Sequence, residues 1–289
     1  MDAFKLNNNS NKPTLTPETF AKLRDFIDSK CGIHFADNKK YLLEKRLLNR
    51  IEHKNLKTYE DYLCYLTYDK GKDIEMRLLY NSISTNETSF FRDPVQLDVF
   101  RRGVLPGIIE TKKARNDKSF RIWSAASSTG EEPLTLAMIL MEEGLHNLGW
   151  TIDIIGSDIS DGVLSMAQKG EYENYAVRNT PPTILKKYFT QTGSSTYKIN
   201  SEVSAFVKYK NINLLNVSDT RMVRQRDIVF CRNVLIYFTD ATKKKVVNNI
   251  YDSLAPGGCL FVGFSESLHN ITRLYKPVSI KNSVVYNKM

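Results

Sequence analysis

The sequence contains few of the residues that commonly bind metals or form disulfides. Among 289 residues there are four cysteines and four histidines. The cysteines, at positions 31, 64, 231 and 259, form no Cys-x-x-Cys pair, and no histidine has ligand-like spacing to them or to carboxylates. We therefore predict no metal site, and we expect reduced thiols in a cytoplasmic protein.

Long hydrophobic runs are also missing. No apolar run approaches the roughly 18 to 20 residues that span a bilayer, so we expect no membrane insertion. Residues 1–16 are rich in Asn, Ser and Pro and contain no apolar core of signal-peptide length. We expect a flexible tail there.

Basic residues outnumber acidic ones. The chain has 41 Lys and Arg against 32 Asp and Glu, a formal net charge of +9. Such an excess serves solubility, or it attracts an acidic partner such as nucleic acid or a carboxylate-rich protein surface. Charge alone does not separate these possibilities. The hydrophobic content of 42% is ordinary for one large or two modest globular domains.

The first third of the chain has helical patterns. Thr16 followed by Pro17 is typical of a helix start, and Gly32 of its end. A second helix is predicted over residues 38–54, where Leu43 and Leu47 share one side. Further helices are predicted over 59–68 and 72–84.

That second helix also has a predicted basic face. At about 100° per residue, the face beside its leucines collects Lys39, Arg46, Arg50 and His53. Residues 39–57 contain seven basic side chains and two acidic ones. A solvated helix face is the alternative to a binding role.

After residue 86 strand-like and helical patterns alternate. Apolar runs rich in Ile, Val and Phe occupy residues 119–126, 150–160, 226–233, 257–267 and 283–288. This alternation predicts an α/β fold with a doubly wound, mainly parallel sheet. The last connection is too short for a crossover helix, so the final pair should be antiparallel. The hydrophilic stretch at about 188–212 predicts a small β subdomain.

The first strand leads into an unusual loop. Ser124–Pro133 reads SAASSTGEEP, in which small side chains replace the glycines of a dinucleotide fingerprint and only Gly130 remains. Glu131 and Glu132 at the predicted helix start disfavour phosphate and favour a cationic ligand group. S-adenosylmethionine, which carries a sulfonium, an ammonium and a ribose diol, fits this pattern.

The second strand ends in Asp158. An acidic residue at this position commonly accepts hydrogen bonds from ribose hydroxyls. The alternative is a helix N-cap, since a helical pattern follows immediately.

Six sequence blocks now form a recognisable set. NETSFFRD, RIWSAASSTGEEP, IIGSDIS, NINLLN, DIVFCRNVLIYF and GGCLFVGFSES occur in this order, and RLLNR lies in the basic helix. The chain thereby resembles the CheR family of chemotaxis receptor methyltransferases from about residue 17 onward. The resemblance implies a helical receptor-recognition domain (17–85), a cofactor-contacting linker and helix (86–118) and a Rossmann-like class I methyltransferase domain (119–289).

The resemblance also implies an activity and partners. Family members transfer a methyl group from S-adenosylmethionine to glutamates on chemoreceptor signalling helices and release S-adenosylhomocysteine. We expect a monomer that binds those helices and no nucleic acid. Cofactor-binding positions carried over by matching blocks are Asn86, Thr88, Arg92, Glu132, Asp158, Asn213, Leu214, Arg232 and Asn233. Arg92 and Tyr237 would be catalytic, and Lys39, Arg46 and Arg50 would recognise the acidic substrate.

The chemistry makes these roles plausible physically. A glutamate carboxylate has a reference pKa near 4.3 and is already ionised at neutral pH, so the reaction needs no general base. It needs in-line placement of the nucleophile, and Arg92 and Tyr237 are donors suited to orient it. Alternatively, Arg92 closes a domain interface and Tyr237 is a core residue, like Trp123. Of Phe90 and Phe91, one could stack on adenine, or both could pack in the core.

Two departures from the family pattern stand out. The block Gly263-Phe264-Ser265-Glu266-Ser267 replaces the usual Gly-His-Ser-Glu-Asn, and these positions receive no predicted role. The β-subdomain loop is short and has only Gly193, which favours an enzyme independent of a receptor's C-terminal pentapeptide.

Two rival functions stay open. One is a nucleic-acid methyltransferase, although the fourth strand lacks an Asp/Asn-Pro-Pro-aromatic motif. The other is a catalytically silent cofactor-binding protein.

Overall fold

A computed structural model describes residues 13–289. Its first part is a helical domain of α1 (Pro17–Cys31), the 3-10 turn η1 (Asp37–Lys39), α2 (Lys40–His53), α3 (Tyr59–Tyr68) and α4 (Lys72–Ile83). The predicted start and end of α1 are confirmed: the Thr16 side chain accepts from the Thr19 N–H, and Gly32 adopts φ 82°. Leu23, Leu43 and Leu47 are fully buried between the helices.

The predicted flexible tail, residues 1–16, extends too far along the chain. Residues 1–12 lie outside the described part of the chain, but Leu15 is fully buried in the helical core. Its N–H donates to Glu44 and its carbonyl accepts from Lys40. The ordered domain therefore begins before Pro17, because an apolar side chain precedes the helix cap and packs beneath it.

A helical linker then leads to the sheet. It consists of α5 (Pro94–Asp98), the π-helical segment η2 (Val99–Val104) and α6 (Leu105–Ala114). Seven strands follow in the main sheet: β1 (Ser119–Ala125), β2 (Thr151–Asp158), β6 (Val207–Asn211), β7 (Arg226–Cys231), β8 (Leu254–Val262), β9 (Tyr275–Ile280) and β10 (Ser283–Lys288).

The strand order is β6-β2-β1-β7-β8-β10-β9. The first five strands in this order pair in parallel, and β10 pairs antiparallel with both β8 and β9. The predicted parallel sheet with an antiparallel final pair is confirmed. Helices between the strands are α7 (Glu131–Glu142), α8 (Asp161–Lys169), α9 (Asn174–Val177), α10 (Pro182–Tyr188), α11 (Ser201–Ser204), α12 (Val217–Thr220), η3 (Arg221–Val223), η4 (Leu235–Tyr237) and α13 (Asp240–Ser253).

The β subdomain differs from its predicted bounds of about 188–212. A three-stranded sheet joins β3 (Glu171–Glu173), β4 (Phe189–Gln191) and β5 (Thr196–Ile199), so the predicted hairpin is present. Residues 207–211, however, form β6 and extend the main sheet beside β2. The polar composition of β6, Val-Lys-Tyr-Lys-Asn, suits an edge strand and hid it from pattern reading.

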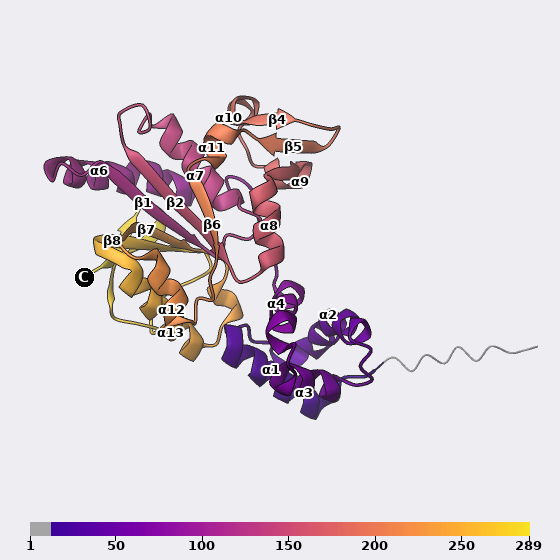
Figure 1. Cartoon of the computed structure of the whole chain (residues 1–289). Coiled ribbons are helices and arrows are strands. Elements are labelled where there is room, and N and C mark those ends of the chain that lie inside the picture. The colour runs from indigo at the N-terminus through magenta and orange to yellow at the C-terminus, as the bar shows by residue number, and fades with distance from the viewer. Residues whose placement is uncertain (1–12) are drawn as a thin grey trace, which may run out of the picture.

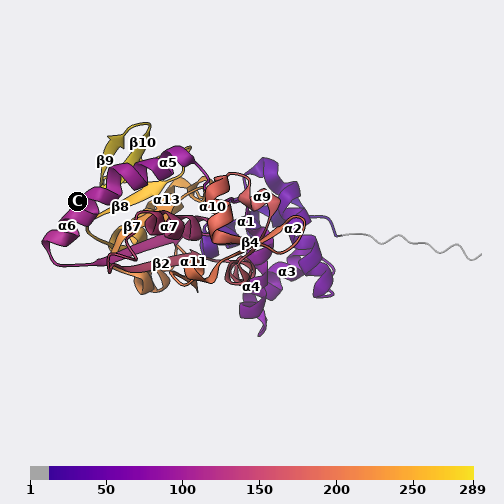
Figure 2. The ribbon, with the colours of Figure 1, turned by 90° about the horizontal axis from the view of Figure 1, so that it is seen from above.

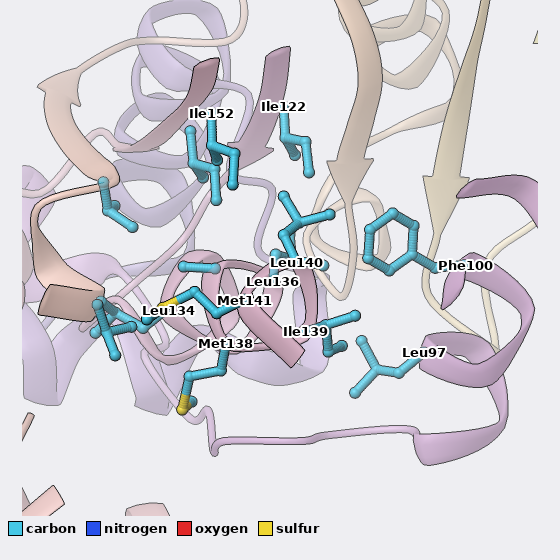
Figure 3. Close-up of a cluster of buried hydrophobic side chains, with 14 of the residues drawn as sticks. Leu97, Phe100, Ile122, Leu134, Leu136, Met138, Ile139, Leu140, Met141 and Ile152 are labelled. Carbon is cyan, nitrogen blue, oxygen red and sulfur yellow. The ribbon is translucent and has the colours of Figure 1, made fainter. Parts of the chain in front are cut away.

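Helix α7 anchors the centre of the fold. Leu134, Leu136, Met138, Ile139, Leu140 and Met141 are all buried, and they lie in one cluster with Ile122, Ile152, Leu97 and Phe100 (Figure 3). Each fully buried aliphatic side chain contributes about 1.5–3 kcal/mol. The helix is thus held rigidly, and its N-terminal residues Glu131 and Glu132 are fixed at the end of β1.

The helical domain lies against the edge where β1, β2 and β7 end (Figures 1 and 2). Hydrogen bonds that join the two parts include those from the Ser160 hydroxyl to the Asn81 side chain (2.8 Å), from the Asn213 amide to the Lys30 carbonyl (2.7 Å), and from the His34 N–H to the Tyr237 carbonyl (2.9 Å). Among residues 13–289, no helix has both the length and the apolar composition needed to cross a membrane.

Candidate cofactor and active site

A cavity of about 360 Å³ lies between the helical domain and the carboxyl ends of the strands. This size is within the range of small-molecule sites. All predicted site residues except Arg50 line it: Lys39, Arg46, Asn86, Thr88, Arg92, Glu132, Asp158, Asn213, Leu214, Arg232, Asn233 and Tyr237. The structure thus brings together side chains that are up to about 200 positions apart in the sequence. Their individual roles stay predictions.

The glycine-poor loop after β1 curls tightly at the floor of this cavity. Ala126, Ser128 and Gly130 have positive φ angles of 62°, 48° and 92°. The Ser127 N–H donates to the Ser157 carbonyl (2.7 Å), which ties the loop to β2. A Cβ at Gly130 would collide with the Tyr209 hydroxyl, so only here is a glycine required.

Small side chains in this loop expose polar atoms to the cavity. Ser127 and Ser128 both line it. The Ser127 hydroxyl is buried and has no hydrogen-bond partner among the described residues. A buried polar atom without a partner costs free energy unless a ligand or water satisfies it. This unsatisfied hydroxyl fits a polar ligand such as the ribose or amino-acid part of a nucleoside cofactor.

Asp158 ends β2 with its carboxylate almost entirely buried. One oxygen accepts from the Ser128 N–H and the other from the Ser160 N–H, both at 3.0 Å. The helix-cap alternative is wrong, because Ser160 is the N-cap of α8. Burial raises the pKa of Asp158. Each carboxylate oxygen keeps a second lone pair, so Asp158 can still accept from a ribose diol at the cavity.

The two adjacent glutamates of the loop have different surroundings. Glu132 lines the cavity, and its carboxylate accepts from the Ser124 hydroxyl (2.6 Å) and from Arg232 (2.9 Å). Glu131 is buried elsewhere and accepts only from the Thr129 hydroxyl among the side chains described. Burial raises the pKa of Glu131 to about 7. Of these two glutamates, only Glu132 lines the cavity and can contact a ligand there.

Arg232 joins two carboxylates and the linker. Its side chain is 3% exposed and pairs with both Glu132 and Asp93, and it also donates to the Arg92 carbonyl (3.2 Å). One cation between two carboxylates leaves a local charge of −1 beside the cavity. This local charge suits a sulfonium or ammonium group beside Glu132. Sequence reasoning missed Asp93, although it ends the NETSFFRD block.

Arg92 and Tyr237 face the same cavity from different elements. Arg92 lies in the linker and donates to the Glu87 carbonyl (3.0 Å), which leaves other N–H groups free for a substrate. Tyr237 ends η4 and is half-buried.

The other aromatic candidates lie outside the cavity. Trp123 is a core residue that donates to Ser157 (2.8 Å), and neither Phe90 nor Phe91 lines the cavity. Stacking of these phenylalanines on adenine is thus not supported.

The remaining loop residues also make structural contacts. The side-chain amide of Asn213 donates to the Lys30 carbonyl and accepts from the Leu215 N–H, and Leu214 is buried beside it. Asn233 has a left-handed backbone, φ 58°. Its N–H donates to Glu266 (2.8 Å), a residue to which the sequence assigned no role.

The predicted basic face is divided in the structure. Lys39 and Arg46 line the wall of the cavity formed by the helical domain. Arg50 does not: its guanidinium forms two 2.8 Å hydrogen bonds to the fully buried carboxylate of Glu75. Arg50 is therefore committed to the domain core, because the periodicity of α2 places it toward α4. This corrects its predicted place on the recognition surface.

No metal site competes with this interpretation in the described part of the chain. Residues 13–289 contain no cluster of three or more His, Cys, Asp or Glu side chains suited to hold a metal ion. All four cysteines are free thiols.

The fold and the cavity define a Rossmann-like, S-adenosylmethionine-dependent methyltransferase. Residues 18–84 match the family model "CheR methyltransferase, all-alpha domain", and residues 86–284 match "CheR methyltransferase, SAM binding domain". The chain belongs to the CheR methyltransferase family.

Named relatives agree with this assignment. Chemotaxis protein methyltransferase 2 of Vibrio cholerae is 34% identical over 278 residues, covering 96% of this chain and 95% of the relative. Chemotaxis protein methyltransferase 1 of Pseudomonas aeruginosa is 34% identical over 271 residues, covering 92% and 96%. The chemotaxis protein methyltransferase of Borreliella burgdorferi is 32% identical over 268 residues, covering 91% and 94%.

Proposed function

We propose that this chain methylates glutamate side chains on the cytoplasmic signalling helices of chemoreceptors. The products are glutamate methyl esters and S-adenosylhomocysteine, and the enzyme acts as a cytoplasmic monomer. Support comes from family membership and from relatives named for chemotaxis. The observation that carries the proposal is that Arg92 and Tyr237 line the same cavity as Asp158 and the net-negative Glu132 cluster.

The residues divide the work of binding the cofactor. Asp158 accepts from the ribose, Glu132 and its partners favour the cationic part, and Ser127 offers a hydroxyl. When bound, S-adenosylmethionine supplies an activated methyl group on a sulfonium. Asn86 and Thr88 of the linker and Asn213, Leu214, Arg232 and Asn233 of the strand-end loops enclose the site.

Arg92 and Tyr237 would orient the acceptor carboxylate. That carboxylate is ionised at neutral pH, so no general base is needed, and the two side chains would hold it in line with the methyl group that a bound cofactor would supply. Because opposite charges are neutralised, a cavity that holds little water favours the step. Arg92 must position the nucleophile without neutralising it, and the N–H groups that it does not use for the Glu87 carbonyl are available for this role.

The wall formed by the helical domain would select an acidic substrate. Lys39 and Arg46 line the cavity on the side of the helical domain, and Arg46 also donates to the Ile83 carbonyl and to the Thr85 hydroxyl (2.8 Å). Cationic side chains at the entrance raise the association rate of an acidic partner at low salt.

The turn between β4 and β5 spans only residues 192–195. We therefore propose that removal of a receptor's C-terminal pentapeptide leaves the rate of methylation unchanged.

Transfer of radiolabelled methyl groups tests the proposed function. The purified enzyme is incubated with labelled S-adenosylmethionine and, in separate reactions, receptor cytoplasmic fragments, DNA and RNA. We expect label on the receptor fragment alone, released as methanol by mild base, as an ester requires. Label on nucleic acid would establish the first rival function. Cofactor binding without any transfer would establish the second.

A further inference from the structure

The loops after β7 and β8 meet beside the cavity. Residues 232–238 follow β7 and carry three predicted site residues, Arg232, Asn233 and Tyr237. Residues 263–267 follow β8, and their Phe264 side chain is 85% exposed. The contact between the two loops depends on Glu266, which does not itself line the cavity.

The Glu266 carboxylate accepts three backbone N–H groups. One oxygen accepts from Asn233 (2.8 Å) and Gly263 (2.6 Å), and the other accepts from Ile236 (3.2 Å). Hydrogen bonds to a charged acceptor are about twice as strong as neutral ones. One side chain thereby fixes the backbone on both sides of Val234 and immediately before Tyr237.

The surrounding backbone is shaped to admit this carboxylate. A Cβ at Gly263 would lie 2.6 Å from a Glu266 oxygen and 3.0 Å from the Asn233 nitrogen, so no side chain fits there. Asn233 has φ 58°, which costs free energy and persists only where other contacts hold it. Its N–H bond to Glu266 is such a contact.

The other ends of the loop have separate anchors. Arg232 is held by Glu132 and Asp93, and the Tyr237 carbonyl accepts from His34. Between these points, the described side chains contribute only Glu266 as a hydrogen-bond partner of the loop backbone. The chemistry requires a carboxylate. Glutamine would replace one acceptor oxygen with an NH₂ group that faces an N–H donor, and aspartate is one methylene shorter.

We propose that Glu266 is a positioning residue for methyl transfer, acting through Asn233 and Tyr237. This inference rests on the proposed function. The carboxylate holds the loop so that the Tyr237 hydroxyl and the Asn233 side chain keep their places at the cavity. The usual family block keeps this glutamate but has histidine where Phe264 stands, so the tether is independent of that departure.

A double-mutant cycle with Tyr237 tests the proposal. Glu266→Gln, Tyr237→Phe and the double variant are compared for the kcat of receptor-fragment methylation, with Glu110→Gln on exposed α6 as control. Misplacement of a catalytic group by about 1 Å costs on the order of 100-fold, so we expect Glu266→Gln to lower kcat about 10- to 100-fold. Tyr237→Phe should then have almost no further effect, because the hydroxyl is already displaced.

A second cycle reads binding instead of turnover. Glu266→Gln and Asn233→Ala are combined, and the affinity for S-adenosylhomocysteine is measured by calorimetry; non-additive losses are expected. Should Glu266→Gln fail to fold, Glu266→Asp keeps the charge but is one methylene shorter, so it weakens the same hydrogen bonds. Independent, multiplicative effects in both cycles, or kcat within twofold of wild type, would overturn the proposal. A wild-type enzyme that binds the product but methylates no receptor refutes the proposed function, and the binding cycle still judges Glu266.

Discussion

Arg92 lies between two residues whose backbone is left-handed. Phe91 has φ 53° and Asp93 has φ 58°, conformations that cost of order 1–3 kcal/mol each in non-glycine residues. The Phe91 N–H donates to Thr135 of α7, and the Asp93 carboxylate pairs with Arg232. The linker is thus pinned on both sides of Arg92, which directs this side chain into the cavity.

Removal of the Arg92 side chain should separate binding from turnover. We expect Arg92→Ala to lower kcat by on the order of 10- to 100-fold through lost orientation of the acceptor. The kcat of Arg92→Lys should lie between those of wild type and Arg92→Ala, since an ammonium lacks the planar fork of donors of a guanidinium. Affinity for S-adenosylhomocysteine should change by only about threefold, or roughly 0.6 kcal/mol. Arg115→Ala, at the exposed end of α6, is the control.

The contrary result is specific. An Arg92→Ala enzyme with near-full turnover and normal cofactor affinity would show that Arg92 only closes the contact between linker and loop.

Glu131 should make stability depend on pH. Burial disfavours its charge and raises its pKa in the folded protein from an ordinary 4.5 to about 7. Tyr172, Tyr209 and the more distant Arg178 are the titratable groups around it. The folded state holds the proton between pH 4.5 and 7 while the unfolded state releases it. Stability should therefore fall as pH rises through this window.

Glu131→Gln removes this dependence. We expect the free energy of unfolding of the variant, relative to wild type, to rise by about 2–3 kcal/mol between pH 5 and pH 8. Urea denaturation at both values measures it, and Glu110→Gln should show no such change. A parallel pH profile for variant and wild type would mean that Glu131 is already ionised in the folded protein.

At the scale of elements, α2 serves two purposes with adjacent turns. Arg46 and the preceding Lys39 face the cavity, whereas Arg50 and Lys54 hold Glu75 of α4, whose carboxylate is fully buried. Two cations and the Tyr62 hydroxyl surround this carboxylate. The helix therefore lines the site and also stabilises the core of the helical domain.

Substitutions at Arg50 of α2 and at Lys39, which ends η1 just before α2, should separate these purposes. Arg50→Ala leaves a buried carboxylate short of a partner and should destabilise the protein by about 3 kcal/mol. Exposed Lys39→Ala should leave stability unchanged but slow receptor methylation at low salt, an effect that shrinks at high salt. Thermal unfolding and initial rates at two salt concentrations measure both. Equal methylation by both variants at low salt, with equal stability, would contradict this division.

At the scale of the whole molecule, much of the fold was predictable. Strand runs rich in Ile and Val, helix caps and the strand-end Asp158 each have local signals, and the predicted sheet is confirmed. Strands β6 and β9 were missed because they are polar and short of apolar alternation. Neither the Arg232–Asp93 pair nor the Arg50–Glu75 pair has a local signal, since each joins segments that only the tertiary fold brings together.

The site also depends on both domains. His34 and Lys30 of the helical domain hold Tyr237 and Asn213 of the methyltransferase domain through backbone and amide hydrogen bonds. The cavity is lined from both sides. The cationic side chains of the helical domain and the cofactor-binding loops of the methyltransferase domain are thus held in a fixed arrangement. Sequence patterns within one domain do not predict this arrangement.

Calorimetric titration with S-adenosylhomocysteine tests the central claim, that the cavity between Ser127, Glu132 and Asp158 holds the nucleoside cofactor. We predict one site per chain. Loss of a hydrogen bond to a charged group costs about 1.5–3 kcal/mol, so Asp158→Ala should bind about 10- to 100-fold more weakly. The absence of any binding heat for a folded wild-type protein, or an Asp158→Ala protein that binds as tightly as wild type, would contradict the account.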